Sequence, residues 1–82
     1  MRTTKQQLEM QVKHVRELLE ELGTPIDLSI EYAYGQPRLV SNKQSNIISI
    51  RQSKSDLNWT IYAIKNVLLE IGYQKRQAER NS

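Results

Sequence analysis

The sequence predicts an α+β fold in which two amphipathic helices pack on one face of a three-stranded antiparallel sheet. Two stretches, one early and one late, carry apolar residues at steps of three and four, the spacing of one face of an α-helix. Between them, apolar and polar residues alternate, as in strands that are covered on one side only. Polar turn sequences separate these stretches. The expected order is therefore α-β-β-β-α.

The first helix is expected to start after Thr4, because Thr4 and Gln7 have the spacing of a capping box. Gly23 can adopt the left-handed conformation that ends many helices, and Pro25 prevents the helix from continuing. One apolar stripe would face the core: Leu8, Val12, Val15, Leu19 and Leu22.

The first strand is expected over residues 26 to 34, where apolar residues occupy every second position. This parity places Tyr32 and Tyr34 on the helix-covered side or its margin, with stacking on a base or a partner ring as the alternative. Ala33 would then face outward. The stretch Gly-Gln-Pro that follows Tyr34 is expected to break the strand, because glycine admits positive φ and proline cannot donate a ladder hydrogen bond.

Two further strands are expected to complete a meander. The second covers about residues 38 to 41, a polar turn covers residues 42 to 46, and the third strand covers about residues 47 to 52. Both connections are short, which favours antiparallel pairing.

The second helix is expected to follow Ser53, with Asp56 in position to complete its cap. Gly72 is expected to end it. Residues 1–72 would then form a single domain, and residues 73–82 a basic polar tail or a frayed helix end. Its apolar stripe consists of Leu57, Ile61, Ile64, Leu68 and Ile71.

Packing both helices on one face of the sheet gives a two-layer sandwich, because each element has one apolar side to cover. The core is expected to combine the two helical stripes with residues of the strands: Ile26, Leu28, Ile30, Leu39 or Val40, Ile48 and Ile50.

The composition excludes several classes of chemistry. The chain has no cysteine and a single histidine, His14, which lies off the apolar stripe. We expect no catalytic residue, no metal site and no cofactor, and hence a protein that is not an enzyme. The N-terminus lacks the apolar stretch of a signal peptide, and no apolar run is as long as a membrane span. A cytoplasmic protein is expected.

Five residues are candidates for contact with a protein partner. The two aromatic ones lie beside the apolar stripe of the second helix, where they either widen the core or anchor an interface. The other three come from the outward side of the strands. The candidates are Trp59, Tyr62, Glu31, Ala33 and Arg38.

A net charge of +3 also permits binding to a polyanion such as nucleic acid. The α-β-β-β-α order is shared with double-stranded RNA-binding domains, although the second helix here places Asp56 where that family opens with lysines. A contact with nucleic acid would use four basic residues: Lys54, Lys75, Arg76 and Arg80.

Residues 26 to 72 combine a strand that ends in Tyr-Ala-Tyr-Gly, a Leu-Val pair and a serine-capped helix. In these features the region resembles a group of small phage and prophage proteins without an assigned activity. The chain departs from the pattern at Gln36 and Pro37, where a second glycine and an aromatic residue are usual. The matching residues are Tyr32, Ala33, Tyr34, Gly35, Leu39, Val40 and Ser53.

The resemblance implies an origin in a phage or mobile element and a non-enzymatic accessory role. The sequence thus favours a protein that binds a protein partner in the host cytoplasm, with inhibition of a host factor as one such role and a homodimer as an open arrangement. Binding of nucleic acid by the basic C-terminal end is the alternative.

Overall fold

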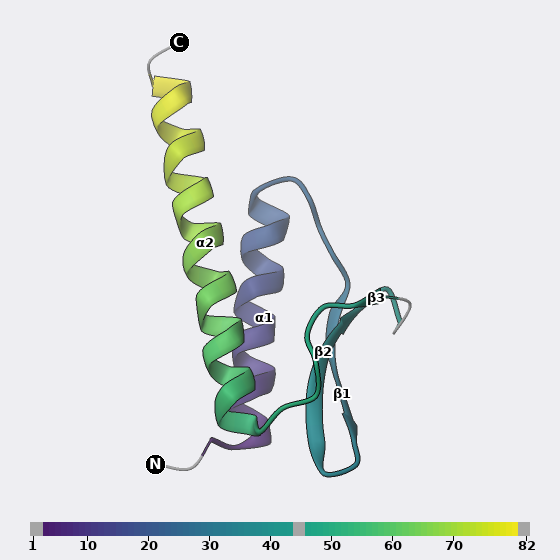
Figure 1. Ribbon diagram of the computed structural model, residues 1–82. Coiled ribbons are helices and arrows are strands. Elements are labelled where there is room, and N and C mark those ends of the chain that lie inside the picture. The colour runs from purple at the N-terminus through teal and green to yellow at the C-terminus, as the bar shows by residue number, and fades with distance from the viewer. Residues whose placement is uncertain (1–2, 44–45, 81–82) are drawn as a thin grey trace.

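The computed structural model describes residues 3–43 and 46–80, and it has the predicted α-β-β-β-α order (Figure 1). The elements are α1 (Lys5–Glu21), β1 (Leu28–Ala33), β2 (Gln36–Ser41), β3 (Asn46–Ile47) and α2 (Lys54–Arg80). The three strands form one antiparallel sheet in the order β1-β2-β3. The α+β fold class is therefore confirmed.

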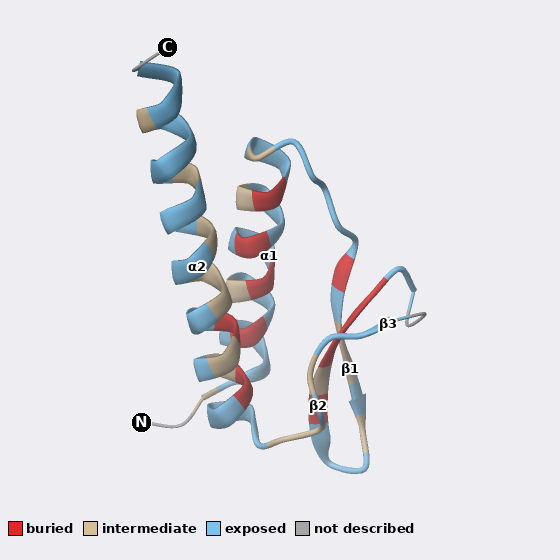
Figure 2. Ribbon diagram, turned by 45° about the horizontal axis from the view of Figure 1, so that its top comes forward, coloured by how far each residue is buried: buried red, intermediate tan, exposed pale blue. Residues whose placement is uncertain are grey.

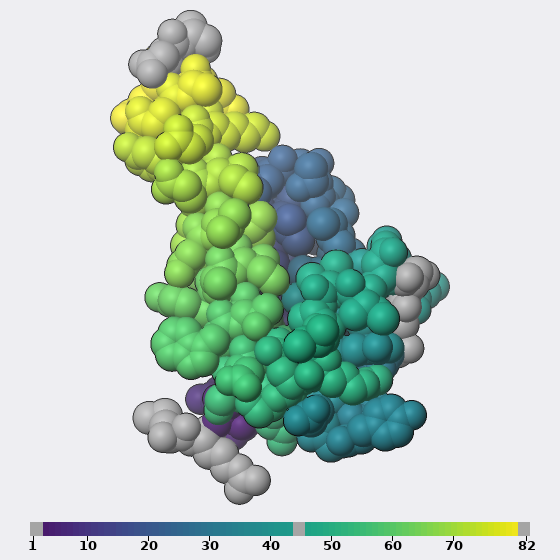
Figure 3. Space-filling model, viewed as in Figure 1, coloured from purple at the N-terminus to yellow at the C-terminus, as the bar shows by residue number. Residues whose placement is uncertain are grey.

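The two helices run side by side in the same direction (Figure 1). Near their first turns, Thr3 Oγ1 and Ser55 Oγ share a hydrogen bond of 3.3 Å. At the other end, Lys75 Nζ donates to the carbonyl of Leu22, at 3.4 Å. Because α2 has 27 residues and α1 only 17, the last turns of α2 project beyond α1 (Figures 1 and 3).

Helix α1 has the predicted ends. The Thr4 hydroxyl accepts from the backbone of Gln7, at 3.2 Å, and the Gln7 side chain accepts from the backbone of Thr4, at 2.9 Å. At the C-terminus, Gly23 has φ +81°, and Thr24 N–H donates to the carbonyl of Leu19, at 3.0 Å. This pattern is a Schellman motif, in which glycine ends the helix and satisfies its last carbonyls.

The core lies between α1, the first half of α2 and the strands β1 and β2 (Figure 2). α1 packs on β1 and α2 packs on β2, so each helix covers part of the sheet. Beyond Ile61, α2 contributes only partly buried side chains to the core, such as Ile64 and Leu68. The buried cluster consists of Leu8, Val12, Val15, Leu19, Leu28, Leu39, Leu57 and Ile61.

The hairpin between β1 and β2 turns one residue earlier than the sequence predicts. Ala33 pairs with Gln36, so Tyr34 and Gly35 form a two-residue turn, with φ +54° and +73°. Positive φ at both positions is the type I′ geometry, which matches the twist of a hairpin. The expected placement of Tyr34 on the core side is wrong, because its side chain is 92% exposed. Pro37, expected in the break, is a buried residue of β2.

The third strand is much shorter than expected, because its pairing with β2 becomes irregular at Leu39, whose carbonyl accepts from both Ile48 N–H and Ser49 N–H, at 2.9 and 3.1 Å. β2 presents Pro37, Leu39 and Ser41 toward the third segment, and Pro37 has no N–H with which to extend the ladder. The Ser49 hydroxyl, rather than a backbone carbonyl, accepts from Leu39 N–H, at 2.9 Å. Regular pairing therefore ends at Ile47. Three residues expected in the core are exposed as a result of these shorter strands: Ile26, Ile48 and Ile50.

Helix α2 does not end at Gly72 but continues to Arg80. A side chain at Gly72 would meet its nearest neighbour, Leu22, at an ordinary 3.7 Å, and its φ lies outside the left-handed region. The expected tail is therefore helical through residue 80, and Ile71, expected on the core stripe, is exposed. Residues 81 and 82, and residues 44 and 45 of the expected turn, lie outside the described residues.

Candidate protein-binding site

The three strand candidates lie in the hairpin, where Glu31 and Arg38 face each other across β1 and β2. Arg38 binds the carboxylate with two nitrogens: Nε lies 3.0 Å from Oε1, and Nη2 donates to Oε2 at 3.1 Å. Arg51 forms a second ion pair with the same carboxylate. The Nε contact lacks hydrogen-bond geometry, so one hydrogen bond and the opposite charges hold Arg38 to Glu31. Glu31 and Arg38 are thus half-buried, and their charged groups are paired with each other.

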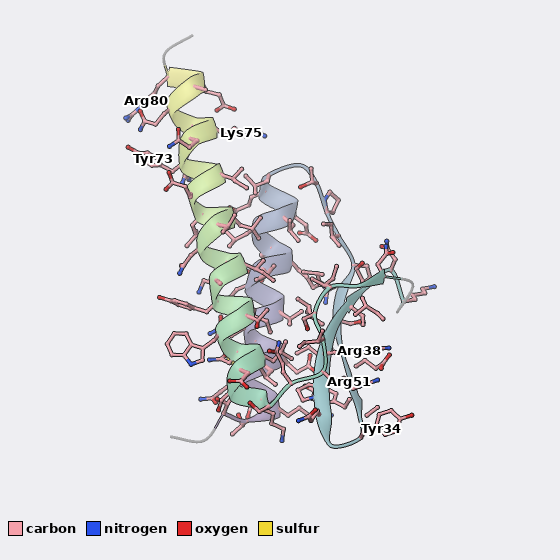
Figure 4. The ribbon with its side chains drawn as sticks, viewed as in Figure 1. Tyr34, Arg38, Arg51, Tyr73, Lys75 and Arg80 are labelled. Carbon is pink, nitrogen blue, oxygen red and sulfur yellow. The ribbon has the colours of Figure 1, made fainter. Side chains whose placement is uncertain are left out.

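Arg51 is a residue that the sequence analysis did not single out. Its Nη1 donates to the carbonyls of Ala33 and Gln36, at 3.4 and 3.3 Å, and its guanidinium lies 5.3 Å from the centroid of the Tyr34 ring. Figure 4 shows Arg51 and Tyr34 near the tip of the hairpin. Arg51 therefore ties the segment after β3 to this turn. The available signal was its position in the strand expected to pair with the one that carries Arg38.

The electrostatics of this cluster favour the charged carboxylate. The hydrogen bond from Arg38 lowers the pKa of Glu31, burial opposes this effect, and Arg51 adds to the lowering. The carbonyl of Ala33 is one of the groups held by Arg51. The hairpin candidates therefore stabilise the sheet, and most of their polar groups are already engaged.

Tyr32 links the sheet to α1 rather than offering its ring for stacking. Its hydroxyl donates to Glu9 Oε1 at 3.1 Å, and Lys5 Nζ lies 4.7 Å from the ring centroid. Burial, followed by the nearby Glu9 charge, raises the pKa of Tyr32 to about 12. Parity along β1 thus places Tyr32 correctly at the margin of the helix-covered side.

Trp59 and Tyr62 are displayed on the surface of α2. Their rings form an edge-to-face pair with centroids 5.9 Å apart and an interplanar angle of 87°. Trp59 is 69% exposed and Tyr62 is 45% exposed. Of the two interpretations open from the sequence, the structure excludes burial of Trp59 in the core. The mutual contact restrains both rings before any partner binds, which lowers the entropy lost on binding.

Two further exposed residues continue this surface along α2. Leu69 and Tyr73 are 44% and 51% exposed, and they follow Tyr62 at helical spacing. Figure 4 shows Tyr73 on the side of α2 that faces away from α1. We call the surface formed by Trp59, Tyr62, Leu69 and Tyr73 the outer face of α2. Leu69 and Tyr73 were not among the candidates predicted from the sequence. Their spacing from Tyr62, in steps of three and four residues, places them on the same side of the helix and was the available signal.

A shallow groove borders the outer face where α2 passes the end of α1. It has a volume of about 250 Å³. Its apolar floor includes Leu18, Leu22 and Leu68, and charged groups such as Glu21 and Lys75 lie at its rim. Leu69 lines the groove, so the groove and the outer face are continuous.

The four basic candidates do not form one patch. Lys54 opens α2, whereas Lys75, Arg76 and Arg80 lie in its last two turns. At 1.5 Å per residue, Lys54 and Lys75 are about 30 Å apart along the helix. Lys75 also points toward α1 and bonds to Leu22, whereas Arg80 lies on the other side (Figure 4). The structure thus brings together Arg76 and Arg80, near the projecting end.

The described residues contain neither a metal-binding group nor a membrane-spanning helix. Within residues 3–43 and 46–80, no group of three or more His, Cys, Asp or Glu side chains is arranged to hold a metal ion. In the same residues, neither helix combines the length and the apolar character needed to cross a membrane.

Comparison of the chain with protein-family models, with curated protein sequences and with solved structures gave no significant match. The fold and the outer face of α2 are therefore the basis for a functional proposal.

Proposed function

We propose that this chain is a small, non-enzymatic accessory protein that acts by binding another protein through the outer face of α2. The observation that carries the proposal is the row of exposed large side chains on this face. Tryptophan and tyrosine are enriched among residues that dominate binding energy, and here they stand in a preformed pair. Exposing a second apolar side of a helix to water is unfavourable in free energy unless a partner covers it.

The nature of the partner is proposed from the phage resemblance alone. The pattern around Tyr32 to Gly35 motivates a host protein as the partner, with inhibition of that protein in the host cytoplasm as the consequence. This proposal involves no catalytic step.

Affinity capture from a host lysate tests the proposal, with nuclease-treated and untreated samples in parallel. The wild-type chain should retain a protein after nuclease treatment. The double variant Trp59→Ala/Tyr62→Ala should retain at least about tenfold less, because two anchor residues are removed. Met10→Ala is the matched control, since Met10 is an exposed apolar residue of α1. Equal capture by the double variant would contradict the proposal.

Binding of nucleic acid is the second candidate, and the projecting end of α2 favours it. Lys75, Arg76 and Arg80 against Glu79 give this end a local excess of positive charge. Capture that disappears with nuclease would support this candidate, and so would an affinity for duplex probes that falls steeply with added salt. The absence of any shift of duplex or single-stranded probes at low salt would exclude it.

A further inference from the structure

Helix α2 carries a second regular stripe besides the one that enters the core. The core stripe includes Leu57, Ile61 and Leu68. The second stripe lies on the opposite side, because each residue advances about 100° around a helix. Its members follow one another at alternating steps of three and four, as in a coiled coil: Trp59, Tyr62, Asn66, Leu69, Tyr73 and Arg76.

This second stripe is largely unused within the molecule. All six of its residues are exposed. Leu69 and Arg76 border α1 along the groove, whereas the side of α2 that faces away from α1 and the sheet is open (Figures 1 and 2). A heptad spacing of this length is the pattern by which one helix packs along another.

We propose that the outer face of α2 binds the same face of a second copy of this chain, with the two α2 helices antiparallel. This inference rests on the proposed function, because it uses the same surface, and it names the partner. Trp59 would face Arg76 of the second copy, where a guanidinium over an indole ring makes a cation–π contact. Tyr62 would face Tyr73 of the second copy. A two-fold axis repeats both contacts, as a closed dimer requires.

The centre of the stripe fits the same register. Asn66 would lie against Leu69 of the second copy, close to the two-fold axis. In this register the two Asn66 residues are offset by only about 4.5 Å along the helices, so that their amides can bond to each other. A single asparagine in such a seam fixes the register at some cost in stability.

The charges decide between antiparallel and parallel pairing. A parallel pair would place Arg76 against Arg76 and Arg80 against Arg80 of the second copy. Like charges this close repel, and they would lose their hydration. In the antiparallel pair each arginine meets an aromatic or uncharged residue instead. The contact extends from Trp59 to Arg76, about 26 Å of helix, and covers apolar area that this small chain leaves exposed.

Spin labels on the full-length chain test the arrangement, because the native sequence has no cysteine. The variant Ala78→Cys carries the label at an exposed site beyond the contact. Antiparallel pairing separates the two labelled residues by about 32 Å along the helix axis, whereas parallel pairing places them at the same level. A distance well below about 32 Å, or no dipolar coupling at concentrations where the chain sediments as a dimer, overturns the proposed arrangement.

Sedimentation equilibrium with a matched pair of variants tests the surface. Leu69→Glu should weaken the dimer at least about tenfold, whereas Val67→Glu should leave it unchanged. Val67 is also exposed on α2 but lies outside the stripe. Circular dichroism shows whether each variant is folded, and Tyr62→Glu provides a second stripe variant. Trp59 is the only tryptophan, so its emission should shift to the red as the protein is diluted and the dimer dissociates.

The outcomes separate this inference from the proposed function. A chain that is monomeric at all concentrations overturns the dimer, and so does a dimer that Leu69→Glu and Tyr62→Glu leave intact. If such a chain still captures another protein through Trp59 and Tyr62, the proposed function stands without the dimer. If the dimer forms as described and no other protein is captured, the second copy is the partner of this face.

Discussion

At the scale of single residues, the hairpin shows that a side chain expected on an open surface can be held by its neighbours. Glu31 faces outward by strand parity, yet Arg38 and Arg51 both bind its carboxylate. Arg51 reaches this position only because the segment after β3 folds back along β2 and toward the turn. The cluster thus joins three segments that are separate in the sequence.

Replacing Glu31 should make stability less dependent on pH. Its folded-state pKa lies below the usual 4.5, so the folded chain favours the ionised carboxylate. This stabilisation is present above the usual pKa and is lost as pH falls through the lower folded-state pKa. Glu31→Gln should therefore unfold at lower urea concentration at pH 7, and the difference from wild type should shrink as the pH is lowered below about 4.

Urea unfolding followed by circular dichroism from pH 3 to pH 7 measures this effect. Glu17→Gln is the control, because Glu17 is an exposed carboxylate of α1. A constant difference between Glu31→Gln and wild type at every pH would show that the ion pairs with Arg38 and Arg51 do not stabilise the fold.

At the scale of elements, α2 differs most from the expectation, because it passes through Gly72 without ending. Helix α1 ends at Glu21, just before Gly23, whose φ is positive and where the Schellman hydrogen bonds form. The same residue type thus has two roles, and backbone conformation distinguishes them. The longer α2 carries Tyr73 and Arg76, which complete the second stripe.

Replacing Gly72 should stabilise the protein, whereas replacing Gly23 should destabilise it. Alanine in a helix interior is favoured over glycine by about 0.5–1 kcal/mol, and the added Cβ at Gly72 meets Leu22 at an ordinary 3.7 Å. At Gly23 the positive φ makes alanine unfavourable by about 1 kcal/mol. Thermal unfolding of Gly72→Ala and Gly23→Ala measures both. A lower melting temperature for Gly72→Ala would mean that the helix ends there.

At the scale of the whole molecule, the core is thin and is shared among four elements. Among residues 3–43 and 46–80, eight buried residues from α1, α2, β1 and β2 form it, and no other element packs against the last turns of α2 (Figure 2). A chain this short buries a smaller fraction of its surface than a larger domain does. Each core residue therefore contributes a large share of the stability, and covering the outer face of α2 would add to it.

Truncation of the core should have a much greater effect than truncation of the helix surface. Leu57→Ala should lose about 2–5 kcal/mol, a large part of the roughly 5–15 kcal/mol that stabilises a small domain. Leu57 is fully buried between the helices and the sheet. Val67→Ala, an exposed change in the same helix, should lose less than about 0.5 kcal/mol. Urea unfolding of both variants measures the difference, and equal losses would contradict this core.

The sequence by itself determined the order of the elements, the two apolar helical stripes over most of their length, and the caps of α1. These features depend on local periodicity and on hydrogen bonds between near neighbours, such as those of Thr4 and Gln7. It also identified Trp59 and Tyr62 as candidates for contact with a partner, because they lie beside the core-facing stripe of the second helix. Whether they belonged to the core was not determined, since burial depends on what packs against a helix.

Only the tertiary structure decided how the strands end and what the outward side chains contact. The third strand stops at Ile47 because Leu39 bonds irregularly to Ile48 and Ser49, a relation between two segments that the local pattern does not contain. The outer face of α2 is exposed because α1 and the sheet cover only the opposite side. Local patterns fix which elements form, whereas pairing between distant segments decides which surfaces remain available for binding.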